Sequence, residues 1–199
     1  PTMTVLSQAF LYRVQREFPA DFLSRTPSDL ETYGKDWTKV FAPRPTAIAF
    51  PRTTDEVSRL CKLCSEMKIP IVPSGGRTGL AGGAVASYGE VVLSLVKMNK
   101  MEAVDPLAQL VRVQAGAVTE AVHEHCAPHG LTWPVDFASK GSSHVGGNLA
   151  TRRGRADAPG RIDRDLARGH GSGRARHAAG QRHQVDHGAV CGAARGDVV

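Results

Sequence analysis

Strand and helix periodicities alternate along the middle of the chain. Residues 47–50 and 69–72 are short apolar runs that predict buried strands. Between them, residues 53–67 carry apolar side chains at helical spacing, with Thr53 or Thr54 as the residue that starts the helix and two acidic residues in its first turn. This order predicts a β-α-β unit that leads into the next segment.

Similar patterns predict the remaining elements. We expect helices at 4–18, 27–33 and 119–127, a buried strand at 90–95, and paired strands at 102–105 and 110–114. The helix at 119–127 would be capped by Thr119 and closed by His129 and Gly130. Residues 131–151 are rich in glycine and serine and lack a regular period, which predicts an irregular loop.

A glycine-rich loop follows the strand at 69–72. Pro73 precedes glycines at 75, 76, 79, 82 and 83, which leave backbone N–H groups uncovered by side chains. Several convergent amides form a nest for an anion such as a phosphate. The spacing matches neither the P-loop nor the GxGxxG dinucleotide motif. A phosphate loop and a plain surface turn both fit, and the double glycine at 146–147 would flank the same extended anion.

Composition divides the chain at residue 151. Through Thr151 there are 15 Lys plus Arg against 14 Asp plus Glu, whereas the last 48 residues have 10 Arg against 5 Asp and no aromatic residue. A segment with so little apolar surface cannot build a core, so we expect 152–199 to be a disordered basic tail. No apolar run reaches membrane-spanning length and no signal peptide is recognisable, so we expect a cytoplasmic protein.

Two groups of potential metal or redox ligands have simpler explanations. Cys61 and Cys64 match CxxC, but both lie on the apolar face of the predicted helix, so we expect them to pack in the core. The histidines and the cysteine within 123–129 include neighbours two positions apart, which point away from each other on a helix. We therefore expect no metal site at either position.

Together, the motifs resemble the FAD-binding domain of the vanillyl-alcohol oxidase (PCMH) type, and within it the D-lactate, glycolate and D-2-hydroxyglutarate dehydrogenase group. The matching segments follow the family's order, at 43–57, 69–84, 90–101, 113–122 and 130–151, and YGKDWT at 33–38 resembles the lead-in of these proteins. The resemblance implies an α/β (α+β) fold with two subdomains, incomplete in this chain. It divides the chain into a helical lead-in at 1–42, the FAD-binding domain at 43–151, and the tail.

The resemblance also implies a cofactor site. In this family the first glycine loop wraps the FAD pyrophosphate with main-chain amides, which implies contacts from Pro73, Ser74, Gly75, Gly76, Arg77, Thr78 and Gly79. The later segment lines the flavin and pyrophosphate from the other side, which implies contacts from Pro134, Asp136, Ser139, Gly141, Ser142, Gly146, Gly147 and Asn148. Members with covalent flavin often carry a histidine in the first loop, where this chain has Arg77 and Thr78, so the resemblance implies non-covalent FAD. We expect His144 to be a solvated loop residue.

The implied activity of the full-length parent is oxidation of a small D-2-hydroxy acid, with hydride transfer to FAD and an unidentified electron acceptor. In that group the substrate, metal and base are handled by later segments, which this chain lacks. We therefore assign no catalytic or metal-ligating residue and expect the truncated chain itself to be inactive. A cell-wall precursor reductase of the same fold is a second enzyme alternative, to which WPVDFASKGSSHVGGN at 133–148 is less similar.

The sequence after Thr151 departs from the family pattern, which continues Asn-Ala-Gly-Gly where this chain has RRGRADAPG. Regrouping possible codons from the second base lets 152–155 encode Ala-Gly-Gly and 161–171 encode Gly-Ser-Thr-x-x-Trp-x-Ala-Gly-Met. We interpret 152–199 as a frame-shifted segment. The alternative is a genuine basic tail that binds nucleic acid through phosphate contacts, although it offers no aromatic side chain for base stacking.

Overall fold

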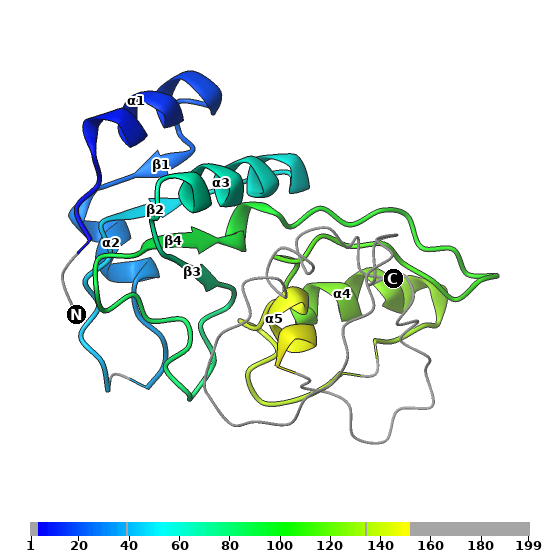
Figure 1. Ribbon diagram of the computed structural model, residues 1–199. Helices are drawn as coiled ribbons and strands as arrows, with labels where there is room; N and C mark the ends of the chain where they lie inside the picture. The colour runs from blue at the N-terminus through cyan, green and yellow to red at the C-terminus, as the bar shows by residue number, and fades with distance from the viewer. Residues whose placement is uncertain (1–3, 39, 134, 152–199) are drawn as a thin grey trace, which may run out of the picture.

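Two packed units make up the described part of the chain (Figure 1). A computed structural model describes residues 4–38, 40–133 and 135–151. The first unit is a four-stranded sheet with helices on both faces, and the second contains α4 (Thr119–Cys126) and α5 (Val145–Ala150). The expected α/β architecture is thus confirmed. The expectations for Pro134 and for 152–199 lie outside the described residues.

The sheet has the strand order β1-β2-β4-β3. Strand β1 (Leu23–Ser24) pairs antiparallel with β2 (Ala47–Ala49). Strand β4 (Val91–Ser94) pairs in parallel with β2 on one side and with β3 (Ile71–Ser74) on the other. Helix α3 (Thr54–Glu66) links β2 to β3, so the predicted β-α-β unit crosses over one strand. The parallel strands end at one edge of the sheet, where the glycine loop begins.

Local sequence fixes the start of α3. Thr53 is the N-cap: its hydroxyl accepts a hydrogen bond from the N–H of Glu56 at 3.2 Å, and the Glu56 carboxylate accepts from the N–H of Thr53 at 3.3 Å. This reciprocal capping box satisfies N–H groups that have no partner inside the helix. Of the two threonines that could start the helix, the structure selects Thr53.

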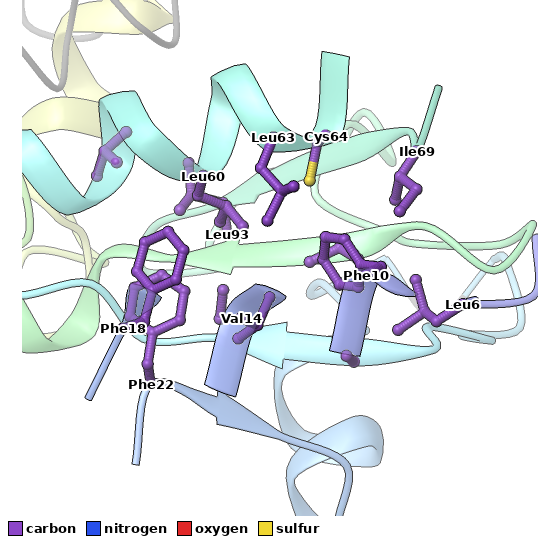
Figure 2. Packing of buried hydrophobic residues seen from close by; sticks show 14 of the residues in the cluster. Leu6, Phe10, Val14, Phe18, Phe22, Leu60, Leu63, Cys64, Ile69 and Leu93 are labelled. Atoms are coloured by element: carbon purple, nitrogen blue, oxygen red, sulfur yellow. The ribbon is translucent and has the colours of Figure 1, made fainter. Parts of the chain in front are cut away.

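Both faces of the sheet are covered. Figure 2 shows Leu60 from α3 beside Leu93 of β4 and Phe10 from α1 (Gln8–Glu17) farther along the same cluster, and all three side chains are fully buried. The alternate residues Ile48 and Val92 belong to a separate cluster on the other face, which also includes residues of α2 (Pro27–Tyr33). Alternation along the strands therefore divides the apolar residues between two cores. The helical lead-in contributes to both of them, while the division at residue 43 stays a prediction.

Cys64 lies in the core beneath α3, as predicted from the helical pattern. Burial raises the pKa of its thiol to about 12, so the thiolate that metal binding or redox chemistry requires is disfavoured. Within 4–38, 40–133 and 135–151 the structure has no cluster of histidine, cysteine and carboxylate side chains suited to a metal ion. In the same ranges no helix is long and apolar enough to cross a membrane.

The second unit differs from the sequence prediction at its two helices and at the predicted strand pair; α5 forms where an irregular loop was expected. Thr119 is the first residue of α4 and not its cap; Val118 precedes the helix, and the Thr119 hydroxyl is engaged with Ser143 at 2.8 Å. The predicted strand pair is limited to the isolated bridges Met101–Val113 and Asp105–Leu110. The predicted closure at Gly130 is confirmed, with φ of +67° after the short 3-10 helix η2 (Ala127–His129).

Candidate cofactor site

The glycine loop after β3 lies directly against the segment that enters α5. A β-carbon placed on Gly75 would be 3.6 Å from Cβ of His144 and 4.0 Å from Cα of Gly147. One placed on Gly76 would overlap the carbonyl oxygen of Ser142 and lie 2.8 Å from Cα of Ser143. The structure thus brings together the two glycine-rich segments that the sequence assigned to one site.

A run of free backbone donors follows this contact. Among the described residues, no hydrogen bond is donated by the N–H groups of Gly75, Gly76, Arg77, Thr78 or Gly79. A β-carbon on Gly79 would meet no atom within 4 Å, so this end of the run is open. Successive unpaired N–H groups are the donors of an anion-binding nest. The loop can therefore satisfy them with a phosphate or with water.

Arg77 adds a cation to the same loop. Its backbone is left-handed, with φ of +56°, and its guanidinium carbon lies 4.7 Å from the centre of the Tyr33 ring. The side chain is half-buried, and in the described part of the chain no carboxylate lies within 4.0 Å of it. Burial lowers the pKa of Arg77, and the group nevertheless stays protonated at neutral pH. A cation without a counter-ion is thus held beside the free N–H groups.

Two buried polar side chains at the site also lack hydrogen-bond partners among the described residues. Ser74, the last residue of β3, is fully buried and its hydroxyl has no such partner, and His144 is 6% exposed with Nδ1 in the same state. Burial, and then the charge of Arg77, lowers the pKa of His144 to about 4, so the imidazole is neutral at pH 7. The expectation of a solvated His144 is wrong. The side chain is enclosed because the glycine loop packs against it at Gly75.

The double glycine at 146–147 lies in a helix and not in the predicted loop. Gly146 belongs to α5, where a β-carbon would be 2.8 Å from Cβ of Ala115, and its N–H donates to the Ala115 carbonyl at 2.8 Å. This close approach requires glycine at position 146. Because glycine has no side chain, the segment shows no helical pattern of apolar residues in the sequence. A β-carbon on Gly147 would meet nothing within 4 Å, so this glycine leaves the space beside it open.

Other residues predicted to contact the cofactor form hydrogen bonds that stabilise the conformation of the second glycine-rich segment. The side-chain amide of Asn148 donates to the Thr119 hydroxyl at 2.7 Å, in a buried network with Ser143. The Ser139 carbonyl accepts hydrogen bonds from the N–H groups of Ser142 and Ser143, at 3.1 and 2.9 Å. These contacts hold the Ser142 carbonyl against the glycine loop. Ligand contacts by Ser139, Ser142 and Asn148 stay predictions.

Two predicted residues are exposed on the surface of the segment. Asp136 pairs with Lys140 at 3.1 Å, and this hydrogen bond lowers the pKa of its carboxyl group. Gly141 is exposed, and a β-carbon there would lie 3.0 Å from a carboxylate oxygen of Glu120. Neither residue forms a hydrogen bond or ion pair with 73–79. Their contact with a cofactor also stays a prediction, and Pro134 lies outside the described residues.

Asp36 also supports the glycine loop, a role that was not predicted from the sequence. This buried carboxylate accepts hydrogen bonds from the N–H of Gly82 at 3.1 Å and from the N–H and hydroxyl of Thr38 at 2.9 and 2.6 Å. It therefore ties the lead-in to the far end of the glycine loop. The signal was present in YGKDWT at 33–38, because an aspartate two residues before a threonine suits a local turn.

The site suits a ligand that carries phosphate. The loop carries the free N–H groups and the guanidinium of Arg77, the neutral imidazole of His144 packs against it at Gly75, and no described carboxylate pairs with them. Such a donor set stabilises a diphosphate by charge-assisted hydrogen bonds. The residues present can therefore hold the phosphates of a dinucleotide cofactor.

Comparison with known proteins points to one class of cofactor. Residues 45–161 match the family described as "FAD binding domain". The chain is 47% identical over 141 residues to a D-2-hydroxyglutarate dehydrogenase of Xanthomonas citri pv. viticola, covering 71% of this chain and 30% of the relative. It is 35% identical over 131 residues to a D-2-hydroxyglutarate–pyruvate transhydrogenase of Saccharomyces cerevisiae, covering 66% and 26%. The chain thus spans about 30% of the length of the relatives it matches.

Solved structures agree on the fold. An alkyldihydroxyacetonephosphate synthase superposes with a TM-score of 0.66 at 24% identity, covering 75% of this chain and 29% of the other. A p-cresol methylhydroxylase with substrate bound superposes with a TM-score of 0.61 at 24% identity, covering 76% and 31%. At this identity the likeness concerns architecture, and both matches leave most of the larger protein uncovered.

Proposed function

The chain belongs to the family of FAD-binding domains, and on that basis we propose that the glycine loop binds the diphosphate of FAD without a covalent bond to the flavin. The observation that carries the proposal is the run of N–H groups from Gly75 to Gly79, none of which donates a hydrogen bond within the described residues. Gly147 and Ser142 line the opposite side. The absence of a histidine in the loop supports a non-covalent mode.

Packing explains how the site keeps its shape without ligand. Gly76 is fixed against Ser142, and Gly82 is held by the Asp36 carboxylate. The N–H groups between them are consequently pre-arranged, which reduces the entropy that binding would otherwise lose. The chain's part in the chemistry is to bind and orient the cofactor, and FAD supplies the redox step.

We assign the parent activity as oxidation of a D-2-hydroxy acid. The support is the sequence identity to D-2-hydroxyglutarate dehydrogenases, which reaches 47%. Because this chain spans about 30% of those relatives, the substrate and acceptor belong to the proposal for the full-length parent, as does a cytoplasmic location. Within the described residues no side chain is assigned a catalytic role, so the chain alone should bind cofactor without turnover.

Thermal unfolding tests the proposed site directly. A ligand that binds only the native state raises stability by RT ln(1 + [L]/Kd), so the melting temperature of the chain should rise steadily with FAD concentration. The FAD should remain removable by gel filtration in denaturant, as expected of non-covalent binding. An unchanged melting curve at high FAD concentration would count against the proposal, and flavin that stays attached after denaturation would contradict its non-covalent form.

A second candidate function concerns the basic tail, whose 10 arginines against 5 aspartates suit phosphate contacts. If the tail binds nucleic acid, DNA affinity should fall steeply with salt and disappear when 152–199 are deleted. FAD protection should survive the same deletion, so one pair of proteins separates the two functions.

A further inference from the structure

Arg77 occupies a backbone conformation that its side chain does not favour. Its φ of +56° is left-handed, a region that is unfavourable for a residue with a β-carbon because the β-carbon comes too close to the following carbonyl oxygen. Glycine would adopt it without this cost. In the described part of the chain, only Lys68 and Gln109 among the other non-glycine residues share a positive φ. The arginine side chain therefore needs an explanation beyond backbone geometry.

The guanidinium of Arg77 stacks on an aromatic ring, but no described carboxylate balances its charge. Its carbon lies 4.7 Å from the centre of the Tyr33 ring, and that ring is itself fixed edge-to-face against Phe50 at 4.9 Å. An aromatic face attracts a cation only weakly. By contrast, Arg13 and Arg52 form ion pairs with carboxylates at the surface. Half-burial of a cation with no carboxylate partner is unfavourable unless an anion completes the site.

The surroundings of Arg77 point to that anion. Within the part of the chain that the structure describes, the neighbouring N–H groups, the fully buried Ser74 hydroxyl and Nδ1 of His144 have no hydrogen-bond partner. No described acidic side chain pairs with any of them. A solvated loop arginine would neither stack on a fixed ring nor lose half its exposure. An anion would therefore serve as the partner of all these groups.

We propose that Arg77 is the counter-cation for a phosphate of the bound cofactor and makes this site select phosphate-bearing flavins over riboflavin. The role rests on the proposed FAD site and adds a side-chain determinant to its main-chain donors. Charge-assisted hydrogen bonds from a guanidinium to a phosphate are among the stronger polar contacts in proteins. Riboflavin shares the isoalloxazine ring but has no phosphate, so it should gain nothing from Arg77.

Two glycine variants test the proposal. Neither should lose stability, but only the variant at position 77 should lose FAD affinity. Arg77→Gly removes the cation and relieves the left-handed backbone. Lys68→Gly is the matched control, because Lys68 has the same φ of +56° and the same charge but lies exposed just after α3. Both variants should melt at or above the wild-type temperature without ligand, because relief of the left-handed backbone outweighs the added chain entropy of glycine.

Flavin affinity should then separate the variants. By fluorescence titration of the full chain, Arg77→Gly should bind FAD roughly tenfold or more weakly, while its riboflavin affinity changes less than about twofold. Lys68→Gly should match the wild type for both ligands. Arg77→Gln, which keeps a long polar side chain, should show the same selective loss and guards against an effect of the glycine itself.

Three results would overturn the role of Arg77: unchanged FAD affinity in both Arg77 variants, equal losses for FAD and riboflavin, or a matching loss in Lys68→Gly. If the wild type binds no FAD, the proposed cofactor site fails, and inorganic pyrophosphate becomes the probe of Arg77. Protection of the wild type and Lys68→Gly by pyrophosphate, but not of Arg77→Gly, would support the counter-cation role. Absence of protection in all three would contradict it.

Discussion

Gly76 and Ser142 meet so closely that a β-carbon on Gly76 would overlap the Ser142 carbonyl oxygen. The two residues belong to different units of the chain, and their backbones are in contact where the glycine loop packs against the segment that enters α5. This contact needs glycine because of space and not because of a positive φ. A side chain at position 76 must therefore displace backbone on one side or the other.

The Gly76→Ala variant should be destabilised by roughly 1–3 kcal/mol, as is typical of overpacking a close contact. FAD affinity should fall with it, because the free N–H groups of the loop move with Gly76. Urea unfolding and flavin titration measure the two effects. Gly79→Ala is the matched control: a β-carbon there meets nothing within 4 Å, so its stability should stay within about 0.5 kcal/mol of the wild type. Equal stability of the two variants would contradict the predicted contact.

Asp36 should matter more for stability than its place in the lead-in suggests. Removal of the buried carboxylate in Asp36→Ala leaves the partly buried N–H groups of Gly82 and Thr38 without their acceptor. Such a loss costs roughly 1–3 kcal/mol. Urea unfolding of the variant should show it, and amide exchange at Gly82 should accelerate.

An exposed aspartate provides the comparison for Asp36. Asp105 also accepts two backbone hydrogen bonds, from the N–H groups of Leu107 at 3.0 Å and Ala108 at 2.9 Å. Water can replace these bonds, so Asp105→Ala should cost well under half as much as Asp36→Ala. If the two losses were equal, burial of Asp36 would not be the reason for its effect.

The sequence predicted best where local signals were sufficient. Helix α2 was predicted at 27–33, where it is found, and α3 was predicted within one residue at each end, because its capping box and apolar stripe are local features. Strand β1 escaped prediction, since two residues that pair with β2 leave no period to detect. Its formation depends on a partner more than 20 residues away.

The sequence predicted where the site lies but not the tertiary contacts that support it. The glycine spacing located the loop, but the burial of His144 and the role of Thr119 depend on contacts between segments far apart in the chain. Helix α5 was missed because two adjacent glycines disfavour a helix locally, and the need for one of them, Gly146, arises only from its close approach to Ala115. Tertiary packing, which overrides local propensity, accounts for each of these differences.

Asn148 should act mainly by holding the second segment. Its buried amide donates to Thr119 at 2.7 Å, so Asn148→Ala leaves that hydroxyl network incomplete and should cost roughly 1–3 kcal/mol. Thr151→Ala removes a hydroxyl that donates to the Gly147 carbonyl at the exposed end of α5, and its cost should be much smaller. Thermal unfolding without FAD compares the two. A normal melting temperature for Asn148→Ala, combined with lost FAD binding, would assign the residue to the ligand instead.

The buried His144 should make the protein sensitive to mild acid. Its folded-state pKa is about 4 against an ordinary 6.5, so the unfolded chain binds a proton over this interval while the native state does not. Stability therefore rises with pH between about 4 and 6.5, and lowering the pH from 7 to 4 should remove on the order of 3 kcal/mol. Urea unfolding at half-unit pH steps measures the slope.

Substitution of His144 by glutamine isolates this contribution. His144→Gln cannot gain a proton, so its unfolding free energy should be nearly flat between pH 6.5 and 4.5, whereas the wild-type value falls. Carboxylates with a lowered pKa, such as Glu17 beside Arg13, begin to lose their contribution near their ordinary values, which are 4.5 or lower, and they do so equally in both proteins, so the difference between the two profiles measures the imidazole. Parallel pH profiles for the wild type and His144→Gln would show that the imidazole is not held neutral by burial, and the enclosed geometry at Gly75 would then have to be abandoned.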